Sequence, residues 1–184
     1  SMLRILDNPL QDIPMAAVLA SPIVGMDDEE LAQIRSAFKG VSFAQAALSA
    51  MAGEDGYEDE KLKAFALVFE RLRGAVADTP IHELLYRMLD ETGFYRYASA
   101  MPAGKRRRQN IDMLIEMAAA YEKTSYKGLF HFVRYIVIQQ KYEIDYGEAD
   151  TAGENDDVVR IMTIHKSKGL EFPVVLSLIH ISEP

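Results

Sequence analysis

A concentrated group of polar side chains lies near the end of the chain, in the segment TIHKSKGLEF at residues 163–172. This segment carries hydroxyl, imidazole, ammonium and carboxylate groups, on Thr163, His165, Lys166, Ser167, Lys168 and Glu171. Gly169 has no Cβ, so backbone amides beside it can approach an anion closely. A carboxylate such as Glu171 only accepts hydrogen bonds, which suits a ribose hydroxyl or a neighbouring cation. These residue types predict a phosphate or nucleotide grip; the alternative is an exposed turn with ordinary surface charges.

Two predicted strands flank this polar turn. The β-branched and aromatic residues that favour strand structure are Val158, Val159, Ile161 and Ile164 before the turn, and Phe172, Val174 and Val175 after it. A buried parallel strand delivers the turn that follows it to the carboxyl edge of its sheet, where α/β proteins hold ligands. Two short strands cannot cover both faces of a sheet, so we expect their partner strands to lie outside this chain.

The rest of the chain predicts helices. Apolar residues recur at helical spacing between capping and breaking residues, within 9–19, 27–40, 42–53, 62–72, 80–93, 104–121 and 129–137. Asp7-Asn8 is expected to cap the first of these helices, with Pro9 at its first position. Ser42 and Gln45 form a capping-box pattern for the third. The apolar stripes are interpreted as core, and the polar segment 147–157 as a linker or exposed loop.

The composition excludes several classes of site. The net charge is −8 with a pI near 5.0, which argues against a free-standing nucleic-acid binder, because phosphate neutralisation supplies most of such a protein's affinity. Cysteine is absent, which excludes disulfides, thiolate metal sites and a cysteine nucleophile. No histidine and carboxylate spacing indicates a metal site. The sequence contains no G-x-x-x-x-G-K-[ST] phosphate-binding loop.

Lys105-Arg106-Arg107-Arg108 is the dense basic run of the chain. It falls at the start of a predicted helix, where positive charge opposes the helix dipole and calls for compensation. DNA phosphate or nearby acidic side chains would compensate it. Contact of Arg106, Arg107 and Arg108 with DNA therefore stays open beside the alternative of a solvated surface.

The segment TIHKSKGLEFPVV closely resembles motif V of the UvrD/Rep-like superfamily 1 DNA helicases. The N-terminal segment LRILDNPLQDIPMAAVLASPIVGMDDEELAQIR, at 3–35, is similar to the part of these helicases that follows motif IV. The segments DNPLQDIP, at 7–14, and YEKTSYKGLFHFVRYI, at 121–136, are similar to sequences of the AddA family. Members of that family are the helicase–nuclease subunits of bacterial double-strand-break repair.

The resemblance implies a mainly α fold, with a helical 2B-type helicase subdomain and short flanking α/β pieces of a RecA-like domain. Residues 1–25 would be the N-terminal piece of RecA-like domain 2A, and 26–157 the 2B domain. Residues 158–175 would return into 2A with motif V. The ending LSLIHISEP, at 176–184, departs from the family pattern, and we expect it to be a non-native tail left by cloning or sequence assembly.

The resemblance also implies roles for the polar turn. Thr163, His165 and Lys166 would contact single-stranded DNA, and Lys168 would help to shape the turn. Gly169 and Glu171 would belong to the nucleotide site; these roles come from motif V of the family.

The parent protein would be an ATP-dependent DNA helicase/exonuclease of the bacterial cytoplasm, acting in recombination and repair. It would use ATP and Mg²⁺, bind single- and double-stranded DNA, and form a heterodimer with an AddB-like subunit. The present chain alone is expected to be inactive and to hold no cofactor. The alternatives are a UvrD/Rep-type repair helicase without nuclease, and a helical module that binds a partner subunit.

A DNA-binding turn that is common in the family has a different sequence in this chain. UvrD-like 2B domains often grip duplex DNA with a glycine–apolar–glycine turn at a helix N-terminus, and the aligned residues here are Gly25-Met26-Asp27. The acids that follow would satisfy the helix dipole themselves and would repel phosphate. We therefore expect an acidic N-cap at this place.

Overall fold

A computed structural model describes residues 1–124, 128–141, 174 and 176. Every regular element in these residues is a helix, which confirms the predicted mainly α class. The chain divides into residues 1–151 and residues 152–184, and the described helices all belong to the first part. The predicted strands and the polar turn at 158–175 lie outside the described residues, apart from the exposed Val174.

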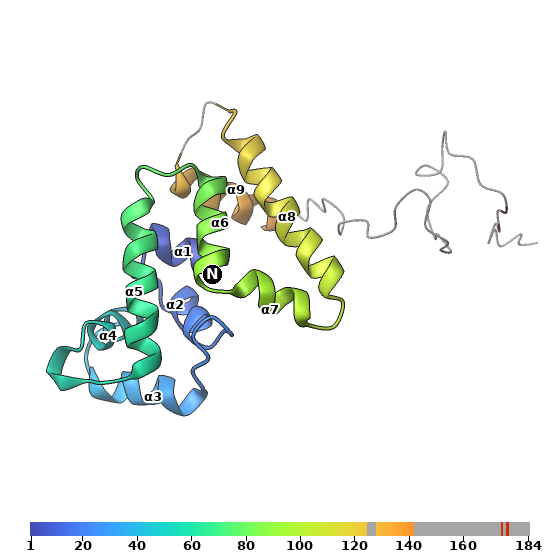
Figure 1. Cartoon of the computed structure of the whole chain (residues 1–184). Coiled ribbons are helices and arrows are strands. Elements are labelled where there is room, and N and C mark those ends of the chain that lie inside the picture. Colours follow the sequence, from blue (N-terminus) through green and yellow to red (C-terminus); the bar gives the residue numbers. More distant parts are fainter. Residues whose placement is uncertain (125–127, 142–173, 175, 177–184) are drawn as a thin grey trace, which may run out of the picture. The chain divides into compact units, whose positions relative to one another are not determined.

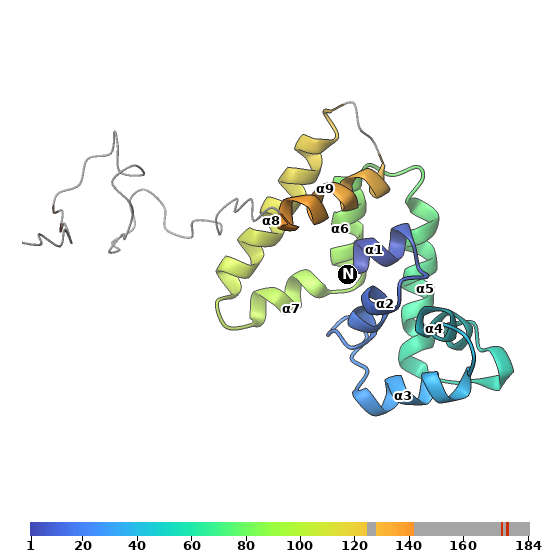
Figure 2. The same ribbon diagram turned by 180° about the vertical axis from the view of Figure 1, so that it is seen from behind.

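The N-terminal helices are α1 (Met2–Asp7), α2 (Asp12–Leu19), α3 (Asp28–Ala37), α4 (Phe43–Met51), the 3-10 turn η1 (Glu54–Gly56) and α5 (Glu60–Ala75). They are followed by α6 (Ile81–Glu91), α7 (Phe94–Ala100), α8 (Gly104–Tyr121) and α9 (Leu129–Lys141). Helix α4 packs on α2, α3 and α5, whereas α6 packs on α5, α7 and α8 (Figure 1). Helix α1 contacts α2, α5 and α9, so it joins the early helices to the last one (Figure 2).

One hydrophobic core runs through these helices. Its largest fully buried side chains are Phe69, Phe132, Ile5, Leu6, Met15, Leu19, Ile34, Leu62, Leu72, Leu84, Leu85 and Val18. Burial of such side chains drives folding, at about 1.5–3 kcal/mol for each large apolar group. The apolar stripes predicted as core are confirmed on α5 and α6, and on α9 at Leu129 and Phe132. This core also crosses the expected boundary between residues 25 and 26, and the assignment of 1–25 to a RecA-like domain stays a prediction.

The capping box that begins α4 is confirmed. Gln45 N donates to Ser42 Oγ over 3.2 Å, and Ser42 N donates to Gln45 Oε1 over 3.0 Å. Gly53 follows α4 with φ at +70°, the left-handed conformation that glycine adopts without a steric cost. Local sequence therefore sets both ends of this helix.

The prediction of a helix capped at Asp7-Asn8 is wrong. Helix α1 ends at Asp7, and α2 begins only at Asp12. Between them Asn8 Oδ1 accepts a hydrogen bond from Leu10 N at 3.0 Å, a turn that competes with the helical backbone pattern. Helices α1 and α7 are absent from the predicted set, because each is too short for its apolar period to stand out.

Candidate nucleic-acid surface

The basic run Lys105–Arg108 lies in the first turn of α8, and all of its side chains are exposed. The chain reaches α8 from α7 through a tight turn at 101–103 (Figure 1). The prediction that these cations begin a helix is confirmed. Their surface position is compatible with both interpretations, DNA contact and a solvated face.

The backbone of the turn before α8 is constrained, and it determines where the basic run begins. Ala103 has φ at +56°, an unusual value for a residue with a Cβ. At Gly104 a Cβ would lie 1.9 Å from the carbonyl oxygen of Ser99, so only glycine fits. The Nε of Arg107 donates to the carbonyl oxygen of Pro102 at 3.1 Å. The sequence and the backbone geometry together therefore position the first turn of α8.

Positive charge at the start of α8 is only partly compensated from within the molecule. Arg107 and Arg108 form no ion pair with any of the residues described. The Pro102 carbonyl takes one N–H of Arg107, but a carbonyl carries no full charge. Since the helix dipole places further positive charge here, an anion from outside would be attracted to this turn.

A hydrogen bond ties α7 to α8 beside the basic run. The Tyr95 hydroxyl donates to the Asp112 carboxylate, at 3.1 Å from Oδ1 and 3.3 Å from Oδ2. Burial, followed by this hydrogen bond, raises the pKa of Tyr95, while the positive charge of Arg108 acts in the opposite direction. Tyr95 therefore stays protonated and donates a hydrogen bond to Asp112, which lies one turn beyond Arg108 on α8.

Sequence reasoning missed the exposed aromatic residue Tyr86 on α6. Tyr86 of α6 is 58% exposed, and its phenol group is close enough to influence the pKa of Tyr95. The signal was present in the sequence, because Tyr86 lies off the buried stripe of α6. That stripe consists of Ile81, Leu84, Leu85, Met88 and Leu89. An aromatic ring on the polar side of an amphipathic helix has no core role.

The acidic N-cap expected at Asp27 is confirmed. Asp27 Oδ1 accepts from Glu30 N at 2.9 Å, and Asp27 N donates to Glu30 Oε2 at 2.8 Å. Lys61 Nζ donates to Glu30 Oε1 at 2.6 Å and to the Gly25 carbonyl at 2.9 Å. The hydrogen bond from Lys61 is the main cause that lowers the pKa of Glu30. The carboxylates of Asp27 and Glu30 thus already cap the N-terminus of α3.

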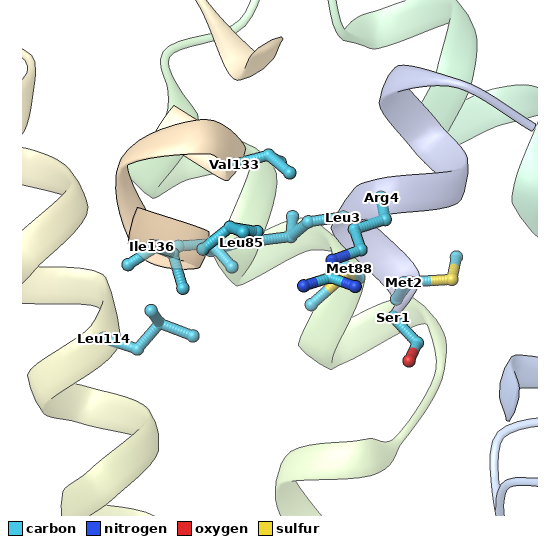
Figure 3. A pocket seen from close by; sticks show the side chains of 10 residues that line it. Ser1, Met2, Leu3, Arg4, Leu85, Met88, Leu114, Val133 and Ile136 are labelled. Carbon is cyan, nitrogen blue, oxygen red and sulfur yellow. The ribbon is translucent and has the colours of Figure 1, made fainter. Parts of the chain in front are cut away.

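An apolar groove of about 400 Å³ lies between α1, α6, α8 and α9 (Figure 3). Leu85, Leu114, Val133 and Ile136 line it together with Arg4 of α1. Ser1 supplies a hydroxyl and the N-terminal amine to the lining, but none of the lining residues is a carboxylate or an imidazole that could act as general base for them.

The predicted motif V residues lie outside the described part of the chain. These are Thr163, His165, Lys166, Gly169 and Glu171. Within residues 1–124 and 128–141, no cluster of histidine and carboxylate side chains could hold a metal ion. No described helix is long and apolar enough to cross a membrane.

Comparison with known proteins identifies the family. A model of the UvrD-like helicase C-terminal domain matches residues 1–183. The chain is 48% identical over 177 residues to an ATP-dependent helicase/nuclease subunit from Anoxybacillus flavithermus, covering 95% of this chain and 15% of the relative. A protein of the same name from Bacillus cytotoxicus is 46% identical over 179 residues, covering 95% of this chain and 14% of the relative.

A third relative has the same name. The Bacillus velezensis protein is 43% identical over 179 residues, which are 96% of this chain and 14% of the relative. The chain therefore spans about 15% of the length of the curated relatives that it matches. It belongs to the family of UvrD-like helicase C-terminal domains, and its relatives there include subunits of ATP-dependent helicase/nucleases.

Proposed function

We propose that the chain is the helical 2B-type segment and motif V of an ATP-dependent DNA helicase/exonuclease subunit. The observation that carries the proposal is the identity of 43–48% to helicase/nuclease subunits along nearly the whole chain. In the parent, ATP hydrolysis drives translocation on single-stranded DNA during double-strand-break repair and recombination in the bacterial cytoplasm.

The proposed division of labour follows the motif. Thr163, His165 and Lys166 contact the single strand, whereas Gly169 and Glu171 lie toward the nucleotide. ATP and Mg²⁺ are held by the parent, because the chain contains no phosphate-binding loop of its own. The chain alone therefore neither hydrolyses ATP nor unwinds DNA. An AddB-like protein is the proposed partner, since the name of the relatives marks each of them as one subunit of a larger enzyme.

The basic run at the start of α8 is the proposed DNA contact of the helical part. Its cations are exposed, and Arg107 and Arg108 have no ion-pair partner in the described residues. A local patch of this kind can bind phosphate even though the net charge of the chain is −8.

Charge reversal in the full-length enzyme tests this contact. The double variant Arg106→Glu with Arg108→Glu should weaken DNA binding at low salt. Each lost phosphate contact should reduce the slope of log affinity against log salt by about 1. Lys39→Glu with Arg73→Glu is the matched control, because it changes the charge equally at exposed positions elsewhere. Unchanged affinity and slope in the α8 variant would remove the basic run from the DNA path.

A further inference from the structure

The groove between α1, α6, α8 and α9 continues onto an exposed apolar face of α9. Val137 lines the groove and is itself 37% exposed. On the same helix, Phe130 is 53% exposed and Ile138 is 42% exposed. Residues seven and eight positions apart share one face of a helix, so these three side chains form an apolar stripe about 10 Å long. We name the groove together with Phe130 and Ile138 the α9 groove surface.

The groove itself combines apolar walls with one cation. Leu85 and Met88 of α6 are buried, whereas Leu114 of α8 and Ile136 of α9 are half-buried. Figure 3 shows the half-buried Arg4 side chain among these apolar residues. None of the lining residues is a carboxylate, and Arg4 forms no ion pair with any described residue. A cation in such surroundings is stabilised by an anion that comes from outside.

The shape of this surface selects the kind of occupant. A small molecule buries most of its own surface in its pocket, whereas this groove is open at Val137 and its apolar surface continues beyond it. An amphipathic helix instead lays side chains three, four and seven positions apart into an apolar groove and keeps its other face in water. A carboxylate on that helix would supply the anion for Arg4.

We propose that the α9 groove surface binds an amphipathic helix of the AddB-like partner subunit, with its apolar side chains in the groove and a carboxylate on Arg4. Charge complementarity favours an acidic segment, because the lining carries a cation and no carboxylate. An exposed apolar surface with a polar group beside it is typical of a contact with another chain. This inference rests on the proposed partner subunit and adds where that subunit binds and by which chemistry.

The affinity between the full-length parent and the AddB-like subunit, measured by biolayer interferometry, tests the surface. Val137→Lys and Ile138→Lys each place a charge on the apolar stripe at an exposed position, so each should weaken binding about tenfold or more. Arg4→Gln removes the cation but keeps a long polar side chain. It should weaken binding about fivefold, because the carboxylate of the partner loses its counter-ion.

Leu67→Lys is the matched control. Leu67 is a 69% exposed leucine on α5, and it does not line the groove. The same kind of substitution there should leave the affinity for the partner subunit unchanged. Thermal unfolding followed by circular dichroism should show equal midpoints for the variants and the wild type, so that lost binding is not lost folding.

Photo-crosslinking identifies the occupant without depending on the stability of a charged variant. The photoreactive residue p-benzoylphenylalanine, placed at the position of Val137, should crosslink to a peptide of the partner subunit. That peptide should contain Asp or Glu among apolar residues at helical spacing. A crosslink within the parent polypeptide or to a second copy of it, a crosslinked peptide without a carboxylate, or no crosslink would each overturn the inference.

Unchanged affinity in both Val137→Lys and Ile138→Lys would overturn it as well. DNA-dependent ATP hydrolysis by the same full-length variants separates this inference from the proposed function. Hydrolysis that is present while partner affinity stays unchanged would leave the proposed function standing and remove only the α9 groove surface. Absence of hydrolysis in the wild-type parent would instead contradict the proposed function.

Discussion

Two glycines in this chain should respond in opposite directions to the same added methyl group. At Gly104 an added Cβ would meet the Ser99 carbonyl oxygen at 1.9 Å, which the backbone cannot accommodate without moving. At Gly74, inside α5, an added Cβ meets nothing within 4 Å. The difference lies entirely in the surroundings, because both residues have helical backbone.

Gly104→Ala should lower the free energy of unfolding by about 1–3 kcal/mol, the usual cost of forcing extra volume into a packed place. Gly74→Ala should raise it by up to about 1 kcal/mol, since alanine is the better helix former. Urea unfolding followed by circular dichroism measures both. A Gly104→Ala variant as stable as the wild type would show that the turn before α8 is not held as tightly as its geometry indicates.

At the level of elements, α2 supplies a cap to α4. The Asp12 carboxylate accepts a hydrogen bond from Ala44 N at 2.9 Å, at the start of α4. This bond is the largest cause that lowers the pKa of Asp12 below its ordinary value of 3.8. A carboxylate at a helix N-terminus also interacts favourably with the dipole. The contact therefore fixes the distance between two helices as well as the end of one.

The stabilisation from Asp12 should depend on pH. Because its pKa is lower in the folded state than in the unfolded one, the ionised carboxylate stabilises the fold above the ordinary pKa, and this effect is lost as pH falls through the folded pKa. The wild type should be more stable than Asp12→Asn near neutral pH, and the difference should vanish in strong acid. Glu70→Gln, which removes an exposed charge from α5, controls for net charge. A difference that is independent of pH would contradict the charged cap.

The elements that sequence analysis predicted depend on interactions between near neighbours. The Ser42–Gln45 and Asp27–Glu30 boxes each span three residues, so their pattern is visible in the sequence. The missed features join residues far apart. Asp12 caps α4 across 32 residues, and Glu122 accepts hydrogen bonds at the start of α6 from 41 residues away.

For the whole molecule, the residues that form the core are distinct from the exposed residues that we propose as DNA contacts. The buried core residues of the described part extend from Met2 to Phe132 and belong to the unit 1–151. The basic run lies on the surface of the same unit. The motif V residues belong to the unit 152–184, so the two proposed DNA contacts of the chain can be tested independently.

A chain that ends at Thr151 should fold like the full chain. The core residues of the described part all lie between Met2 and Phe132, so we expect the urea midpoint and the m-value, which scales with the surface exposed on unfolding, both to be unchanged. Its low-salt affinity for oligothymidylate should also be retained, because the basic run remains. A lower m-value would mean that residues after Thr151 bury surface on folding. Loss of oligothymidylate binding with an unchanged m-value would instead assign the single-strand contact of this chain to motif V.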